Sequence, residues 1–174
     1  PNDGSAWLFV YDTLATNETA MQLPFRTLEA FVPVCHVASA PLVMVTHPNT
    51  PYRSFQDVVD AAKRAPNTIN FGSSSVGGLP HVATTLLQEQ GGFRLVHVPY
   101  RGTMPAMQDA LSGAVPLFIA AAVALRQPIH AGQLRPLGVT TRLESRHVPG
   151  TKSFAEQGFA NFDAPTWFGM LGRS

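Results

Sequence analysis

Charged residues and cysteine are scarce in this sequence. Lysine, arginine, aspartate and glutamate make up 13% of the 174 residues, and the formal net charge is +1. Because no block of basic residues is present, the charge pattern typical of nucleic-acid binding or of attachment to a membrane surface is missing. The single cysteine, Cys35, excludes an internal disulfide. It lies in an apolar stretch, residues 31–38, where we expect a buried thiol rather than a nucleophile.

Long hydrophobic runs are missing as well. No run reaches the roughly 18 apolar residues of a membrane span, and residues 1–4, PNDG, carry neither the basic nor the apolar region of a signal peptide. What is present is 45% hydrophobic residues, enough for a sizeable core. The composition predicts a compact soluble domain, either cytosolic or the mature form of an exported protein.

Strand-like apolar runs alternate with helical patterns, which predicts an α/β protein with a mainly parallel sheet. We expect strands at residues 6–10, 33–37, 42–45, 68–71, 95–99, 115–119 and 137–139. Helices are expected from Ser54 to before Pro66, from Val82, from Thr103 to Gly113, and at residues 124–130 and 151–157. Ser54 and Asp57 form a capping-box pattern, which indicates where the first of these helices begins. Two tryptophans, Trp7 and Trp167, are expected in the core.

The most informative motif is the hydroxyl-rich segment GSSSVGGLPH at residues 72–81. It follows a predicted strand and precedes a predicted helix. Backbone N–H groups, hydroxyls and the positive end of the helix dipole meet at such a junction, which favours an anion. A Gly/Ser-rich strand-to-helix turn is equally typical of an ordinary connection. In open parallel sheets, ligands bind beyond the carboxyl ends of strands, where this loop and residues 100–103 both lie.

The residue spacing in this loop does not match two common enzyme motifs, the nucleotide P-loop and the hydrolase nucleophile elbow. A nucleotide P-loop needs a lysine after the second glycine, but Gly77 is followed by Gly78 and Leu79. A hydrolase elbow needs Gly-x-Ser-x-Gly, but Val76 stands at the position of the second glycine. A serine hydrolase using Ser74 or Ser75 with His81 and Asp57 would therefore lack its usual support. The six histidines form no i, i+4 pair and no metal-ligand spacing, so neither a metal nor a cofactor is expected.

Several blocks occur in a defined order: Asp3-Gly4, Pro24-Phe25, FVPV at 31–34, the 72–81 loop, VPYRG at 98–102, DALSG at 109–113, AGQLRPLGVTT at 131–141 and FAEQG at 154–158. This order resembles the tripartite tricarboxylate transporter substrate-binding receptors, also called the TctC or Bug family. The resemblance implies a type II periplasmic-binding-protein-like α/β fold. It also implies a periplasmic, non-enzymatic receptor that binds a small organic carboxylate between two lobes and delivers it to a tripartite membrane permease.

The resemblance further implies a set of ligand-binding residues: Ser73, Ser74, Ser75, Val76, Gly77, His81, Tyr100, Arg101, Gly102, Thr13 and Asn17. The serine loop would hold one carboxylate through N–H groups and a hydroxyl. His81 either donates to the ligand or fixes the loop. Arg101 either attracts the anion or is solvated or paired with an acid. Thr13 and Asn17 fall in what resembles a cleft-facing loop of the first lobe.

Family receptors are longer, so the resemblance implies a chain that starts late and stops early within the first lobe. The expected division is a partial first lobe and hinge at residues 1–41, a complete second lobe at 42–136, and a return to the first lobe at 137–174. Hinge strands are expected near 37–41 and 134–140. Exposed apolar surface would favour self-association. A receptor-derived fragment without ligand binding is the alternative.

One departure from the family pattern concerns selectivity. Several family members carry an aspartate directly after the strand that here reads Leu117-Phe118-Ile119, and Ala120 stands there instead. A neutral side chain cannot compensate a buried ammonium group, so amino-acid-like ligands are disfavoured relative to simple or aromatic carboxylates.

Overall fold

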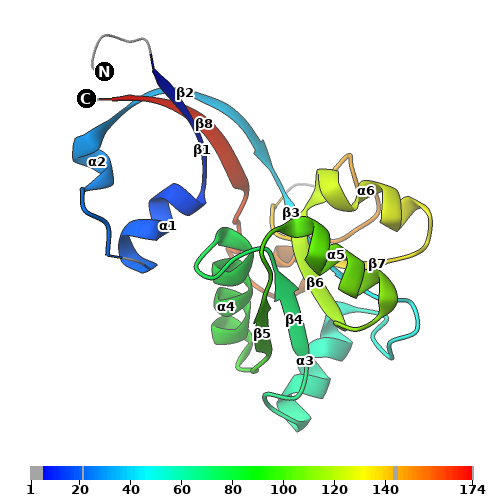
Figure 1. The fold of residues 1–174 in the computed structure, drawn as a ribbon. Helices are drawn as coiled ribbons and strands as arrows, with labels where there is room; N and C mark the ends of the chain where they lie inside the picture. The colour runs from blue at the N-terminus through cyan, green and yellow to red at the C-terminus, as the bar shows by residue number, and fades with distance from the viewer. Residues whose placement is uncertain (1–5, 21, 143–144, 174) are drawn as a thin grey trace.

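The chain forms two bodies, each built on its own sheet. A computed structural model describes residues 6–20, 22–142 and 145–173. Figure 1 shows a small sheet with two helices at one end of the molecule and a larger sheet surrounded by helices at the other. The small sheet has the strand order β1-β8-β2, and the larger has the order β5-β4-β6-β3-β7. The α/β fold class predicted from the sequence is confirmed.

The larger sheet is mixed rather than mainly parallel. Its strands are β3 (Leu42–Thr46), β4 (Asn70–Ser73), β5 (Val96–Pro99), β6 (Leu117–Ala121) and β7 (Arg135–Val139). Strand β4 pairs parallel with both β5 and β6, as predicted. Strand β3 pairs antiparallel with β6 and with β7, which departs from the prediction. Strand direction depends on which body a segment enters from, and the alternation of apolar runs carries no signal for it.

Helices cover both faces of the larger sheet. They are α3 (Phe55–Arg64), α4 (Leu79–Gly91), α5 (Thr103–Ser112), α6 (Ala122–His130) and a short 3₁₀ helix, η1 (Ala155–Gln157). Because successive side chains of a strand point to opposite faces, Leu42 and Met44 enter the core under α3 and α4. Val43 and Val45 enter the core under α5 and α6. None of the helices in the described residues is long and apolar enough to span a bilayer.

Local sequence signals correctly predicted one boundary in each of two helices, α3 and α5. Ser54 accepts the N–H of Asp57 at 3.2 Å, and the Asp57 carboxylate accepts the N–H of Ser54 at 2.8 Å, so the predicted capping box is confirmed. Gly113 ends α5 in the left-handed region, at φ 79°, as predicted. Helix α4 begins at Leu79, three residues before the predicted start, because Gly78 is its N-cap and Pro80 fits its first turn. Of the helix expected at residues 151–157, only η1 forms.

The smaller body contains three antiparallel strands and two helices. They are β1 (Trp7–Tyr11), β2 (Phe31–Ala40), β8 (Thr166–Arg173), α1 (Thr13–Ala20) and α2 (Thr27–Ala30). Strand β8 and both helices were not predicted. Residues 32–39 are exposed along both faces of β2. The predictions of a buried Cys35 and a core Trp7 are wrong, since Cys35 is exposed and Trp7 is 56% exposed. Apolar sequence predicts a strand but not whether another element covers it.

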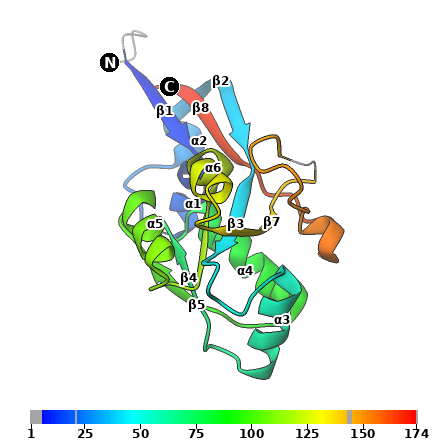
Figure 2. The same ribbon diagram turned by 90° about the vertical axis from the view of Figure 1, so that its right-hand side faces the viewer.

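Two segments connect the bodies. The first lies between β2 and β3 at Pro41, and the second leads from Ala164 into β8. The hinge expected near residues 37–41 stays a prediction, and the connection at Pro41 lies at the end of that range. The second was expected at 134–140, but β7 lies within the larger sheet and Phe154, Phe159 and Phe162 pack in its core. The chain therefore returns to the smaller body near residue 166 rather than at 137 (Figure 2).

Candidate functional site

A cavity of about 310 Å³ lies between the two sheets. Its lining residues are Tyr11, Asp12, Thr13, Leu42, Ser74, Ser75, Pro80, Gly102, Thr103, Ala120, Ala121, Thr166 and Phe168. The larger body forms one wall of the cavity. This wall contains the carboxyl end of β6, the loops that follow β4 and β5, and the starts of α4 and α5. Ala121, the N-cap of α6, completes it. Three helix N-termini thus meet at one wall, and their dipoles favour negative charge there.

The three serines of the loop, Ser73, Ser74 and Ser75, differ in their surroundings. Ser73 is 0% exposed, and its hydroxyl contacts the Ser75 carbonyl at 3.0 Å and His97 Nε2 at 2.7 Å. Ser74 and Ser75 line the cavity instead, and their hydroxyls have no hydrogen-bond partner within the described part of the chain. The loop therefore presents two hydroxyl groups to the cavity and uses the third for its own structure.

The rest of the predicted loop faces elsewhere. The Val76 side chain is 66% exposed and is not part of the cavity lining. Gly77 adopts φ 73°, and its N–H donates to His81 Nδ1 at 3.1 Å. His81 therefore fixes the loop, which is one of the two roles expected for it.

Two stacked imidazoles support this loop from below. The rings of His81 and His97 lie 3.9 Å apart at an interplanar angle of 12°, and His97 also stacks on Phe71 at 4.9 Å. Burial and then the neighbouring His81 lower the pKa of His97 to about 4, and burial lowers the pKa of His81. Both rings are therefore neutral near pH 7, which leaves His81 Nδ1 free to accept the Gly77 N–H.

The second predicted loop contributes one lining residue of the three named. Tyr100 donates its hydroxyl to Asp109 at 2.7 Å, and burial followed by this bond raises its pKa to about 12. The Tyr100 ring packs against Gly72, where a Cβ atom would lie 3.1 Å from Tyr100 Cε2. Arg101 is exposed and lies outside the lining, whereas Gly102 lines the cavity as the N-cap of α5.

The smaller body forms the facing wall. Thr13 lines the cavity, but Asn17 does not. Both residues belong to helix α1 rather than to the expected loop, and Asn17 lies one turn further along it. Asp12, between β1 and α1, is 5% exposed. Its carboxylate accepts the Leu79 N–H and the Thr13 hydroxyl at 3.4 Å each, and also the Thr166 hydroxyl. Asp12 therefore joins the smaller body to the first turn of α4.

Sequence reasoning missed several lining residues. Tyr11 and Asp12 follow the first predicted strand, and a polar residue just after a strand was an available signal for Asp12. Thr166 and Phe168 belong to the unpredicted β8, so no pattern pointed to them. Thr103 belongs to the 100–103 segment that the sequence placed beyond a strand end, but it was not among the predicted ligand-binding residues.

The groups at this wall suit the binding of an anion better than catalysis. Asp57, the acid of the hypothetical triad, is used in the capping box of α3, and its two backbone N–H bonds lower its pKa. Within residues 6–20, 22–142 and 145–173, no group of three or more His, Cys, Asp or Glu side chains could hold a metal ion. The wall instead offers hydroxyls and helix N-termini, which hold an anion without reacting with it.

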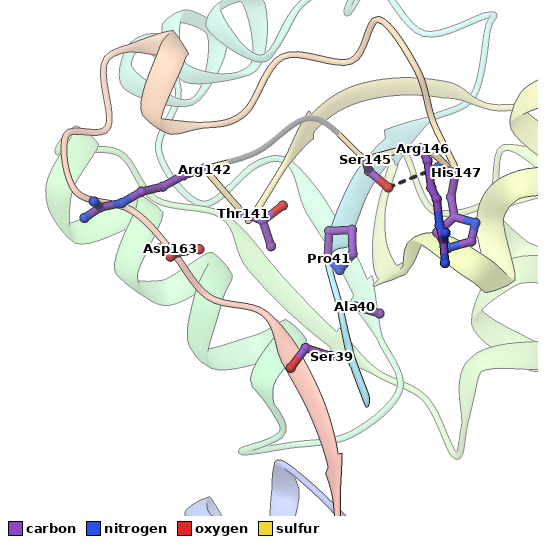
Figure 3. A pocket seen from close by; sticks show the side chains of 9 residues that line it. All are labelled: Ser39, Ala40, Pro41, Thr141, Arg142, Ser145, Arg146, His147 and Asp163. Carbon is purple, nitrogen blue, oxygen red and sulfur yellow. Dashed lines mark hydrogen bonds between the residues drawn. The ribbon is translucent and has the colours of Figure 1, made fainter. Parts of the chain in front are cut away.

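A second cavity, of about 390 Å³, lies beside the segments that connect the bodies. Its lining residues are Ser39, Ala40, Pro41, Thr141, Arg142, Ser145, Arg146, His147 and Asp163 (Figure 3). Figure 3 shows that Arg142 extends away from Arg146 and His147. Cations that point apart do not converge on one anion. We therefore place the candidate site in the first cavity, although the second is larger.

Comparison with known proteins agrees with this geometry. The family model described as Tripartite tricarboxylate transporter family receptor matches residues 1–173. Protein BugT of Bordetella pertussis is 33% identical over 149 residues, which cover 86% of this chain and 46% of BugT. The chain thus spans about half the length of the curated relatives it matches. The prediction of a receptor rather than an enzyme is confirmed at the level of the family.

Solved structures show the same fold. A structure described as a periplasmic transporter matches with a TM-score of 0.91 at 26% identity, covering 100% of this chain and 59% of the other. A Rhodopseudomonas palustris protein solved with adipate matches with a TM-score of 0.91 at 25% identity, covering 99% of this chain and 58% of the other.

Proposed function

Because this chain belongs to the tripartite tricarboxylate transporter receptor family, we propose that it binds a small organic carboxylate in the cleft between its two sheets. The observation that carries the proposal is the wall where α4, α5 and α6 begin, together with the unpartnered hydroxyls of Ser74 and Ser75. Such donors hold an anion by hydrogen bonds and dipoles without a full ion pair, so the anion can dissociate again. The relative solved with adipate supports a carboxylate as the ligand class.

The proposal extends to the cellular role. The receptor acts in the periplasm and delivers its ligand to the membrane subunits of a tripartite transporter, in keeping with the family description and with the relative described as a periplasmic transporter. Release follows when the two bodies separate about Pro41 and the segment before Thr166. Separation takes Thr13 and Asp12 away from the serine loop, so it removes one wall of the cleft.

Ligand binding is tested by a thermal-shift screen of mono-, di- and tricarboxylates, amino acids and aromatic acids, because a ligand that binds only the folded state raises Tm. Hits are then titrated against Ser74→Ala and Ser75→Ala. Loss of one hydroxyl that donates to a carboxylate weakens binding by roughly 1.5–3 kcal/mol, which is about tenfold or more. Ser112→Ala is the matched control, since Ser112 is exposed and its hydroxyl bonds only to neighbouring backbone, the Asp109 carbonyl and the Ala114 N–H, away from the cavity.

Two results would contradict the proposal. The first is a cooperative melt that no acid shifts, which would leave a folded receptor-like chain without binding of its own. The second is a bound acid whose affinity both serine variants leave unchanged, which would remove the serine loop from the site.

A further inference from the structure

Asp12 is the one charged side chain among the residues that line the cleft. The other lining residues are hydroxyl-bearing, apolar or glycine. Asp12 is 5% exposed, and none of the ion pairs found in the described residues involves it. Its carboxylate is held by neutral donors alone: the Thr13 and Thr166 hydroxyls and the Leu79 N–H. The Asp12 carboxylate therefore lines the cleft without a compensating cation among the described residues.

The Asp12 carboxylate also retains room for another partner. Two carboxylate oxygens offer about four acceptor positions. Three donors are assigned to them, and the bonds from Thr13 and Leu79 are long, at 3.4 Å each. A strong donor or a cation placed in the cleft would therefore find an acceptor here. A second anion in the same place would be repelled, because charges interact strongly where water is excluded.

The two ends of the cleft differ in charge because of the position of Asp12. Its bond to Leu79 places a negative charge at the first turn of α4. The starts of α5 and α6, at Thr103 and Ala121, line the cleft without such a charge, and Ser74 joins them because its carbonyl accepts the Gly102 N–H at 3.1 Å. A ligand carboxylate is favoured between Ser74 and the start of α5. The opposite end of the ligand then faces Asp12.

We propose that Asp12 makes this cleft selective for ligands that carry an ammonium group as well as a carboxylate, and that it excludes dicarboxylates; this rests on the proposed carboxylate site. The two charges of such a ligand match the two ends of the cleft. The inference from Ala120 that amine-bearing ligands are disfavoured is thereby reversed. Ala120 lines the same cavity, and the compensating carboxylate comes from the facing wall.

The test compares acids of equal chain length that differ only at the far end. Isothermal titration at pH 7 pairs succinate with γ-aminobutyrate, and adipate with ε-aminocaproate. Butyrate and hexanoate, which lack a group at the far end, serve as references. The wild-type chain should bind the better of the two amino acids at least about tenfold more tightly than the diacid of the same length. Asp12→Asn should reduce this preference by about tenfold or more, chiefly by improving the diacid.

Asp60→Asn is the matched control, because Asp60 lies on α3 and bonds Gln56 at 2.7 Å, away from the cleft. It should leave the preference unchanged. Wild-type preference for the diacid, or equal affinities within each pair, would overturn the inference while leaving carboxylate binding intact. Absence of binding by every acid, the references included, would overturn the proposed function and this inference with it. The wild-type comparison needs no variant, so it decides the question even where Asp12→Asn fails to fold.

Discussion

At the scale of single residues, the best-defined feature is the contact chain beneath the serine loop. It runs from Gly77 through His81 and His97 to Ser73. The Gly77 N–H donates to His81 Nδ1 at 3.1 Å, the two imidazole rings stack at 3.9 Å, and His97 Nε2 lies 2.7 Å from the Ser73 hydroxyl. The sequence suggested a loop-fixing role for His81. His97, by contrast, was expected only in a strand, and its part in the loop depends on the parallel pairing of β4 with β5.

This chain of contacts predicts a pH dependence of stability. The pKa of His97 is lowered from 6.5 to about 4 in the folded state, mainly by burial. Between those values the unfolded chain binds more protons than the folded chain, so the free energy of unfolding falls as pH falls. The contribution is complete above pH 6.5 and is lost progressively down to about pH 4. Urea unfolding across this range should therefore show decreasing stability toward acid.

His97→Gln should flatten that slope, because the variant has no imidazole at the buried position. His36→Gln is the control, since His36 lies exposed on β2. An identical pH slope in the wild type and in His97→Gln would show that other groups cause the acid sensitivity.

At the scale of elements, Thr140 joins the segments that connect the two bodies. Its hydroxyl accepts the Leu42 N–H at 3.0 Å and donates to the Ala164 carbonyl at 2.8 Å. Its own N–H donates to the Leu42 carbonyl at 3.0 Å, and its carbonyl accepts the Ala164 N–H at 2.9 Å. One buried residue at the end of β7 thus ties the start of β3 to the approach of β8, close to where the bodies separate.

Replacing this residue should destabilise the protein. Thr140→Val keeps the shape of the side chain and removes its hydroxyl, which leaves the buried Leu42 N–H without a partner. Such a loss costs about 1–3 kcal/mol, measurable as a lower urea midpoint at unchanged slope. Thr85→Val is the matched control, because the Thr85 hydroxyl donates only to His81 one turn earlier in α4. Equal effects of the two substitutions would argue against a special role for Thr140.

At the scale of the whole molecule, the two bodies differ in how well they are covered. The larger sheet has helices on both faces and two buried clusters. The smaller sheet exposes large apolar side chains, among them Trp7, Phe9, Tyr11, Val32, Val34 and Val37. Its two edge strands, β1 and β2, are available for pairing in the described structure. Apolar patches and open edges of this kind favour association between chains.

We therefore expect the 174-residue chain to associate through the smaller sheet. Sedimentation velocity should show an average mass that rises with protein concentration. Val34→Thr on β2 should lower that rise, whereas Val123→Thr should not, although Val123 on α6 is more exposed, at 63% against 46%. A monomeric mass at every concentration would contradict the expectation, and equal effects of the two variants would place the contact elsewhere.

The sequence by itself determined what depends on neighbours along the chain. The capping box at Ser54 and Asp57, the left-handed stop at Gly113, the α/β class and the family all follow from residue types at fixed spacing. The tertiary structure alone decided what depends on residues far apart in sequence. Asp12 faces Ser74 and Ser75 across one cleft, Thr140 bridges Leu42 and Ala164, and β8 forms between β1 and β2. Local propensity acts within a few residues, whereas burial, charge balance and strand pairing depend on which distant segments meet.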